Sequence, residues 1–259
     1  MNTDTAFRIG KAHSVCQDYG MTGSGNSKFV LLSDGCSSSP DTDVGARLIV
    51  RSAANILLKN TIDFIQPVGP SLAEYHQKVI GAARSFVEPL GLHPHSLDAT
   101  LLTLQAVEGR WIASISGDGT LAMQDGDGVI HLRTISYTRS YPFYLNYSGD
   151  VDRLEALGRQ TDNLRLMERS VLRPDGRVEV QETVTELAQT EPYCETGKVE
   201  DFQWIAILSD GVGSFVRVDD SGAHEPVPLN TVLRELLAFK NFNGVFVERR
   251  MQRFLRDCT

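Results

Sequence analysis

Two apolar runs far apart in the chain end in the same three residues, Ser-Asp-Gly. They read FVLLSDG at 29–35 and WIAILSDG at 204–211. A short apolar run that stops at turn-forming residues is typical of a buried β-strand. The pattern therefore predicts two core strands, and each of them delivers an aspartate to its end.

Helical spacing of apolar residues follows the first strand and returns near the end of the sequence. In 44–59 the apolar positions of one helix face are Ala46, Ile49 or Val50, Ala53 and Leu57. A second helix is predicted to start at Ser71, because Glu74 three residues later completes a capping box. Its apolar stripe runs through Leu72, Tyr75, Val79 and Phe86. Two more helices are predicted at 229–239 and 244–257.

Strand-like runs joined by short turns lie between the helical segments. Four of them, at 99–107, 110–117, 120–124 and 129–134, predict an antiparallel meander. A hairpin is predicted at 164–184 around the Pro-Asp-Gly turn, and 23–28 is interpreted as a hairpin loop. Residues 137–162 predict a loop. Helices separated from antiparallel strands indicate an α+β layered fold, and the absence of linkers or repeats predicts one domain.

Aspartate-glycine pairs occur six times, and their contexts differ. The pairs at Asp125, Asp127 and Asp175 lie between alternating strands, where Asp-Gly is an ordinary hairpin turn. Asp34 and Asp210 instead follow fully apolar strands, with no partner strand directly after them. Their carboxylates are therefore expected at the rim of the core, either as a shared cation site or as simple caps of the strand ends.

Carboxylates that converge at the rim of the core restrict which ions can bind there. Two of them repel each other unless a proton or a cation lies between them. Hard oxygen ligands without nearby histidine or cysteine favour Mg²⁺ or Mn²⁺ over zinc. Two such ions can bridge and activate a water molecule for in-line attack.

The amino-acid composition restricts the kinds of binding partner and the cellular location that we expect. The 259 residues carry a net charge of -8, which argues against nucleic acid or an anionic membrane as the main partner. Four cysteines lie far apart with no Cys-x-x-Cys pair, which predicts a reducing cytoplasm and no zinc site. The first residues lack an apolar signal core, and no apolar run is long enough to span a membrane. We therefore expect a cytoplasmic protein.

Two further aspartates complete an ordered series. Asp18 follows Gln17, and Asp118 lies in a Gly-Asp-Gly between two predicted strands. The order Gln-Asp, Ser-Asp-Gly, Gly-Asp-Gly, Ser-Asp-Gly resembles the metal-dependent type-2C serine/threonine protein phosphatases over nearly the whole chain. The segment GKAHSVCQD at 10–18 is similar to a bacterial branch of that family. The resemblance implies a four-layer α-β-β-α sandwich, in which helix pairs flank two antiparallel sheets.

The resemblance also implies a binuclear Mn²⁺ or Mg²⁺ centre at one sheet edge. Asp34 would bridge the two metals, and the Gly35 carbonyl would bind one of them. Asp210 would ligate the other, and Asp18 would bind directly or through water. Asp118 matches a position that some members use for a third, looser metal. The implied reaction is hydrolysis of phosphoserine or phosphothreonine by metal-activated water, without a phosphoenzyme.

Three positions depart from the family pattern. Cys36 stands where the family has a histidine that is proposed as general acid. His13 stands where many relatives have a phosphate-binding arginine, so it is a candidate catalytic residue, and the alternative is a loop histidine bonded to backbone. A last metal-binding aspartate before a final core strand is not matched, because Asp257 lies in a helical pattern. That core strand is expected to be absent.

The expected substrate is a phosphorylated protein, with a serine/threonine kinase as a candidate second partner. The alternative is a phosphatase-like binding module without turnover, and a weaker third reading is a structural protein without metal. Substrate choice is expected to depend on a variable flap-like segment at about 137–200. Its aromatic residues are expected to cover the core rather than form a substrate platform, and they are Tyr141, Phe143, Tyr144 and Tyr147.

Overall fold

The computed structural model describes most of the chain. The described ranges are 1–10, 13–25, 27–59, 72–139, 142–159, 162–187, 191–218, 224–256 and residue 258. Three residues named in the sequence analysis, Ser71, Tyr141 and Asp257, lie outside these ranges.

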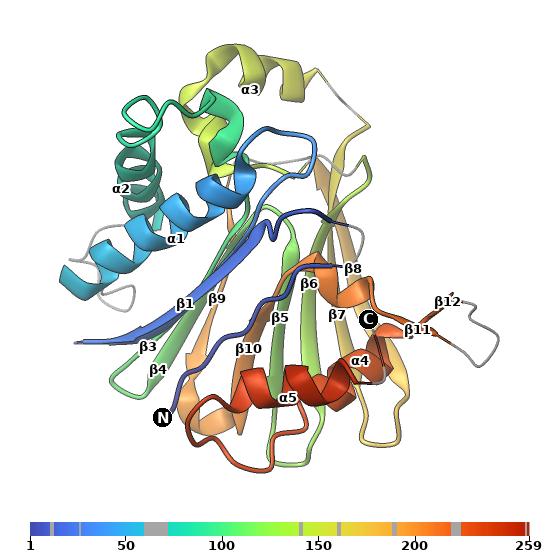
Figure 1. Cartoon of the computed structure of the whole chain (residues 1–259). Helices are drawn as coiled ribbons and strands as arrows, with labels where there is room; N and C mark the ends of the chain where they lie inside the picture. The colour runs from blue at the N-terminus through green and yellow to red at the C-terminus, as the bar shows by residue number, and fades with distance from the viewer. Residues whose placement is uncertain are drawn as a thin grey trace.

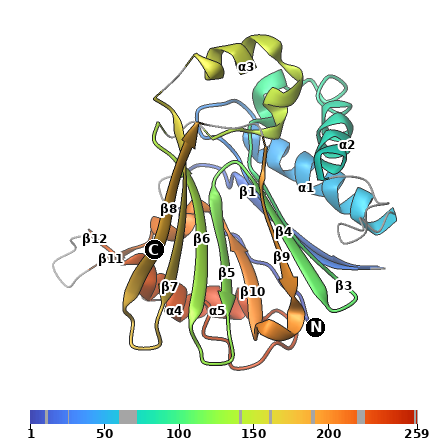
Figure 2. The same cartoon turned by 180° about the vertical axis from the view of Figure 1, so that it is seen from behind.

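Two antiparallel five-stranded sheets form the centre of the fold (Figures 1 and 2). The first sheet has the order β1-β2-β3-β4-β9, with strands Asp18–Ser24, Lys28–Asp34, Leu101–Val107, Arg110–Ser116 and Tyr193–Lys198. The second has the order β10-β5-β6-β7-β8, with strands Trp204–Leu208, Gly119–Gln124, Ile130–Tyr137, Leu164–Leu172 and Val178–Leu187. A short third pair consists of β11 (Val216–Val218) and β12 (His224–Pro226).

Helices cover the outer faces of both sheets. The helices are α1 (Thr42–Lys59), α2 (Leu72–Arg84), α3 (Val151–Gly158), α4 (Leu229–Leu236) and α5 (Phe246–Phe254). Short 3-10 turns are η1 (Pro94–Leu97), η2 (Leu145–Gly149), η3 (Val199–Asp201) and η4 (Asp210–Gly213). The pair α1 and α2 lies on the first sheet, and α4 and α5 lie on the second (Figure 1). The expected four-layer sandwich is therefore confirmed.

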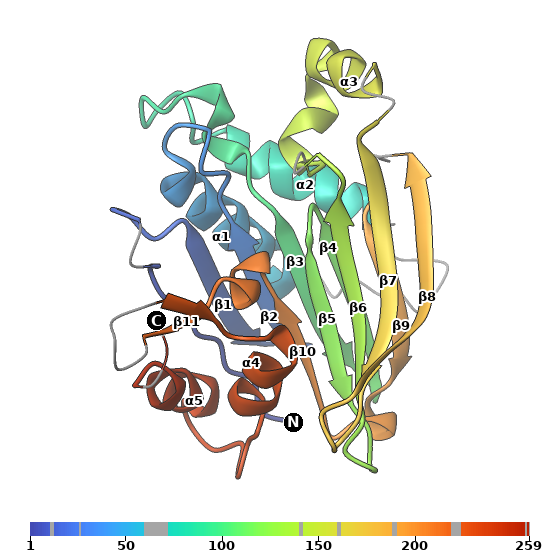
Figure 3. The same ribbon diagram turned by 90° about the vertical axis from the view of Figure 1, so that its right-hand side faces the viewer.

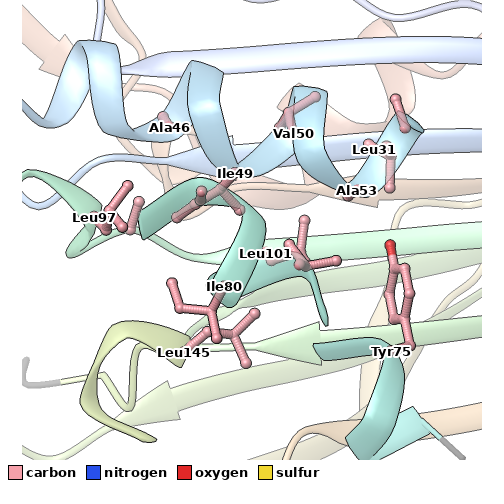
Figure 4. Close-up of a cluster of buried hydrophobic side chains, with 14 of the residues drawn as sticks. Leu31, Ala46, Ile49, Val50, Ala53, Tyr75, Ile80, Leu97, Leu101 and Leu145 are labelled. Atoms are coloured by element: carbon pink, nitrogen blue, oxygen red, sulfur yellow. The ribbon is translucent and has the colours of Figure 1, made fainter. Parts of the chain in front are cut away.

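Three apolar clusters hold the layers together. The first lies between α1, α2 and the first sheet, where Ile49 and Ile80 meet Leu31 and Leu101 (Figure 4). The second lies between α4, α5 and the second sheet, and the third fills the space between the two sheets. The stripe predicted for 44–59 is buried along its length, since Ala46, Ile49, Val50, Ala53 and Leu57 are at most 1% exposed.

The predicted four-strand meander is wrong at its middle. β3 pairs with β4 and β5 pairs with β6, but β4 and β5 belong to different sheets. The link between them contains Gly117 at φ 92° and Gly119 at φ 143°, conformations that other residues rarely adopt. A side chain at Gly119 would also meet the Leu102 side chain at 2.7 Å. These glycines let the chain cross between the sheets, and Asp118 lies between them.

The segment predicted as a loop at 137–162 contains structure. It includes η2 and the helix α3, which lies at one end of the molecule (Figure 3). Asp150 caps α3 by accepting a hydrogen bond from the Arg153 backbone N–H at 3.0 Å. α3 has no fully buried residue, and its apolar stripe is short, because only Leu154 and Leu157 pack against the cluster of Phe143, Tyr144 and Tyr147.

Two other predictions need correction. The stripe of the second helix does not reach Phe86, because α2 ends at Arg84 and Phe86 is 50% exposed in the turn that follows. The apolar pattern does not predict β1 as a strand, but β1 pairs with β2 as an antiparallel hairpin whose strands end at Ser24 and begin at Lys28, within the range 23–28 that predicts a hairpin loop. Within the described residues, no helix combines the length and the apolar character that crossing a membrane requires.

Candidate metal centre

Four aspartates from both sheets line one cavity of about 1530 Å³. Asp18 begins β1 and Asp34 ends β2 in the first sheet. Asp118 lies in the link from β4 to β5, and Asp210 follows β10 in the second sheet. All four aspartates predicted for the site therefore reach the same cavity, at the place where the two sheets meet.

The register of the β1–β2 hairpin places two of these carboxylates together. Asp18 is the direct partner of Asp34 in the antiparallel pair, so both side chains lie on the same face. The backbone of Asp34 is held on its other side by Thr100: the Asp34 N–H donates to Thr100 Oγ1 at 2.9 Å, and the Thr100 N–H donates to the Asp34 carbonyl at 2.9 Å. The position of Asp34 is thus fixed from both neighbouring strands.

Carboxyl groups from the two sheets lie close together, because the Asp34 side chain hydrogen-bonds that of Asp210. Burial raises the pKa of Asp34 to about 9, and the charge of Asp18 and a hydrogen bond with Asp210 raise it further in the same direction. Burial also raises the pKa of Asp118 to about 6, with Asp210 adding to the effect. Since like charges disfavour ionisation, this cluster needs a proton or a cation to be stable at neutral pH.

Within the described part of the chain, one carboxylate oxygen of Asp18 has no hydrogen-bond partner. Burial raises its pKa, while a hydrogen bond from the Ser209 side chain opposes that rise. Its Oδ1 is buried and has no hydrogen-bond partner among the described residues. A buried acceptor without a donor is costly, and a bound cation would satisfy it.

The donor set fits a hard divalent cation. Among the described residues, no group of three or more histidine, cysteine, aspartate or glutamate side chains is already arranged to hold a metal ion. Magnesium, however, is commonly held by one or two carboxylates and keeps several waters, so a three-sided protein cage is not required. The contact between Asp34 and Asp210 supplies such a pair of carboxylates.

Gly35 leaves no room for a side chain. A Cβ atom there would lie 2.7 Å from the Thr42 carbonyl oxygen and 2.8 Å from its Cβ. The Gly35 N–H donates to the Gln17 carbonyl at 3.2 Å, so this backbone connects the two hairpin strands near the aspartates. The close approach explains why glycine follows Asp34, and it keeps the Gly35 backbone beside the carboxylate cluster.

His13 lies in an exposed loop that lines the same cavity. Its backbone N–H donates to the Gly10 carbonyl at 3.0 Å, and its ring charge would lower the pKa of Asp18. The structure therefore places His13 beside the carboxylates without fixing its ring through any side-chain hydrogen bond among the described residues.

Cys36 contacts an aromatic cluster near η2. Burial alone would raise the pKa of its thiol, but hydrogen bonds from Ser38 and Tyr144 bring it below the usual value. Its Sγ lies 3.1 Å from Ser38 Oγ, and the side chain packs against the cluster of Phe143, Tyr144 and Tyr147. The Cys36 side chain thus connects the loop after Asp34 with the segment around η2 by packing and hydrogen bonding.

The serines of the repeated Ser-Asp-Gly phrase are site residues that the sequence analysis missed. Ser33 Oγ donates to the Thr100 carbonyl at 2.5 Å, and Ser209 hydrogen-bonds Asp18. Each serine therefore fixes a neighbour of the carboxylate cluster. The signal was present in the sequence, since the serine is repeated together with the aspartate.

Comparison with known proteins decides the family. The profile of protein phosphatase 2C matches residues 10–256. The chain belongs to the protein phosphatase 2C family. Among solved structures, the serine/threonine phosphatase Stp1 from Staphylococcus aureus is similar, with 12% identity, a TM-score of 0.55, and coverage of 100% of this chain and 94% of that chain. A bacterial serine phosphatase gives 11% identity and a TM-score of 0.55, with 97% and 88% covered.

These structural similarities concern the fold of this protein phosphatase 2C chain. At 11–12% identity they support the sandwich and leave the individual site residues to the geometry described above. A comparison with curated protein sequences finds none that matches.

Proposed function

We propose that the chain is a Mn²⁺- or Mg²⁺-dependent phosphatase that hydrolyses phosphoserine and phosphothreonine esters in proteins. The observation that carries the proposal is the contact between Asp34 and Asp210, made across two sheets with Asp18 and Asp118 beside them. Family membership supplies the reaction class, since the matching profile is that of a protein phosphatase.

Each predicted ligand has a role that its position supports. Asp34 and Asp210 would hold the cations, together with the Gly35 carbonyl and Asp18, and Asp118 would serve a looser third ion. When bound, Mn²⁺ or Mg²⁺ supplies the Lewis acidity that makes a water molecule nucleophilic near neutral pH. Ser209 orients Asp18 by a hydrogen bond and so leaves its Oδ1 for a ligand.

The lining of the cavity also includes a side chain that can donate a hydrogen bond to the phosphoryl group of a substrate. His13 is exposed at the cavity and would hydrogen-bond a phosphoryl oxygen. The proposed substrate is a phosphorylated protein, and a serine/threonine kinase that makes such substrates is the proposed functional partner. A cytoplasmic location remains a prediction from the cysteine pattern.

A second candidate is a phosphatase-like binding module without turnover. It is favoured by Cys36, whose thiol hydrogen-bonds Ser38 and Tyr144 where the family pattern expects a histidine. The module would keep the fold and bind a phosphorylated partner.

Turnover of p-nitrophenyl phosphate and of a phosphothreonine peptide with and without Mn²⁺ tests the proposal. We expect Mn²⁺-stimulated hydrolysis by the wild type and its loss in Asp34→Asn. Asp175→Asn is the matched control, because Asp175 also precedes a glycine but lies in an exposed hairpin turn. Binding of Mn²⁺ and phosphopeptide without hydrolysis would instead support the binding module.

A further inference from the structure

The 3-10 turn η2 brings aromatic residues to the carboxylate-lined cavity. Phe143, Tyr144 and Tyr147 form one buried cluster at this turn, directly before α3 in the chain. Of the three, Tyr144 lines the same cavity as Asp34 and Asp118. The cluster covers the core, as the sequence predicts for these residues, but Tyr144 also faces the candidate metal centre.

The Tyr144 hydroxyl lies close to the carboxylates. It donates a hydrogen bond to the Cys36 sulfur, and Cys36 is two residues beyond Asp34. The charge of Asp118 also reaches Tyr144, since it contributes to the raised pKa of the phenol. Burial is the main cause of that raised pKa, so the hydroxyl keeps its proton and remains a donor at every physiological pH.

A buried polar hub fixes the turn that carries Tyr144. Asp98 is 1% exposed, and its Oδ1 accepts hydrogen bonds from Asn146 Nδ2 at 2.8 Å and from the Arg153 guanidinium at 3.0 Å. Its Oδ2 accepts from the same guanidinium at 2.7 Å and from Ser39 Oγ at 3.0 Å. The Arg153 guanidinium lies 4.0 Å from the centre of the Tyr147 ring. One carboxylate therefore connects η2 and α3 with the loop after Asp34.

Asp98 also holds Cys36, whose sulfur accepts the hydrogen bond from the Tyr144 hydroxyl. The Cys36 N–H donates to the Asp98 carbonyl at 2.8 Å, and Thr42 Oγ1 donates to the Cys36 carbonyl at 3.0 Å. Tyr144 and Cys36 are thus positioned by one rigid unit centred on Asp98. Such double fixing is what a side chain needs if its hydroxyl is to meet a ligand in a defined place.

A phosphoryl group in this cavity needs donors that the cationic side chains do not supply. Among the described residues that line the cavity, the lysine and arginine side chains are those of Lys28 and Arg8. Lys28 donates to the Met1 carbonyl, and Arg8 is paired with Glu248. Each cation thus already has a partner away from the carboxylate cluster, so a neutral hydroxyl at the rim of that cluster is a suitable donor beside His13.

We propose that Tyr144 binds the phosphoryl group of the substrate by hydrogen-bond donation, exchanging the Cys36 sulfur for a phosphoryl oxygen. Asp98 and Arg153 act as positioning residues that hold Tyr144 in place. The inference rests on the proposed function for its substrate.

Phosphate affinity and steady-state kinetics of Tyr144→Phe test this role. We expect the dissociation constant of inorganic phosphate, measured by calorimetry on the Mn²⁺-loaded protein, to rise about tenfold, the effect of one lost hydrogen bond to a charged group. KM for p-nitrophenyl phosphate should rise in parallel, with kcat changed less. Tyr193→Phe is the control, because its hydroxyl bonds Glu195 on β9, outside the cavity. Mn²⁺ affinity should be the same in all these proteins.

A double-mutant cycle separates positioning from general damage. Arg153→Lys should weaken phosphate binding when Tyr144 is present and have little further effect in the Tyr144→Phe background. Equal phosphate affinity in wild type and Tyr144→Phe would overturn the inference while leaving the phosphatase proposal intact. A wild type that turns over no substrate yet binds phosphate through Tyr144 would overturn only the phosphatase proposal. A wild type that binds no phosphate with Mn²⁺ present would overturn the inference as well.

Discussion

Asp18 and Asp34 are direct partners across the β1–β2 hairpin, and their carboxyl groups share one face of the first sheet. Like charges placed opposite each other destabilise an antiparallel pair. This unfavourable pair lies where Asp210, from the second sheet, hydrogen-bonds Asp34. A local conflict of this kind is typical of functional sites.

Asp34→Asn should make the metal-free protein more stable and remove its response to Mn²⁺. The amide still donates to Asp210 and is neutral without a proton, so folding at pH 8 no longer has to take up the proton that the buried Asp34 carboxyl requires. We expect a gain on the order of 1–3 kcal/mol in the free energy of unfolding at pH 8, measured by urea titration in EDTA. Thermal unfolding with Mn²⁺ should show a rise in midpoint for the wild type only, with Asp175→Asn behaving as wild type. A variant less stable than the wild type in EDTA would contradict the raised pKa of Asp34.

The pH dependence of metal-free stability should carry the sign of a raised carboxyl pKa. In the folded state Asp34 keeps its proton up to about pH 9, whereas in the unfolded chain it loses it near pH 4. Between these values the folded state binds more protons, so stability falls as pH rises. Asp118, with a pKa of about 6, adds the same sign over a narrower range.

Urea titrations in EDTA from pH 5 to pH 9 measure this slope. The wild type should lose stability across the range more steeply than Asp34→Asn. Because the ligands must lose protons to bind a cation, the apparent Mn²⁺ affinity of the wild type should rise over the same range. Parallel slopes in the two proteins would show that Asp34 titrates normally in the fold.

Sequence alone predicts the elements whose signals are local. The buried runs ending at Asp34 and Asp210 and the stripe of α1 carry their periodicity in neighbouring residues, and all three form as predicted. The four aspartates could be chosen as site candidates because each ends or joins strands. Their meeting in one cavity depended on the family resemblance, since no local signal says which strand ends meet.

The features that sequence reasoning missed depend on tertiary contacts. α3 has only a short apolar stripe, Leu154 and Leu157, and a polar hub around Asp98 also fixes it to the loop after Asp34. The crossing between the sheets at Asp118 looks like a hairpin turn in sequence, because Gly-Asp-Gly suits both. Only the pairing partners of β4 and β5 distinguish the two.

Gly35→Ala should disturb the metal centre through the backbone. The new methyl group would lie 2.7 Å from the Thr42 carbonyl oxygen, so the loop after Asp34 has to move. We expect a loss of about 1–3 kcal/mol in the free energy of unfolding, as for other overpacked sites, together with weaker Mn²⁺ binding. Gly81→Ala is the control, because nothing lies within 4 Å of its Cβ position in α2. That control should gain about 0.5–1 kcal/mol from helix propensity.

His76 should limit stability in acid, independently of the metal centre. Its ring on α2 is 4% exposed, and neither ring nitrogen has a hydrogen-bond partner among the described residues. Burial lowers its pKa to about 4, whereas in the unfolded chain it titrates near 6.5. Between these values the unfolded chain binds more protons, so stability falls as pH decreases from about 6.5 to about 4.

His76→Leu should remove this acid sensitivity, because it replaces an unpaired buried ring by an apolar side chain of similar size. The shift of about 2.5 pKa units corresponds to about 3 kcal/mol at pH 4, so the variant should be more stable than the wild type by up to this amount there. The gain near pH 7 should be smaller. His224→Gln, at an exposed position on β12, is the control and should follow the wild type. An equal loss of stability in His76→Leu and wild type between pH 6.5 and pH 4 would mean that His76 is protonated inside the fold at no extra cost.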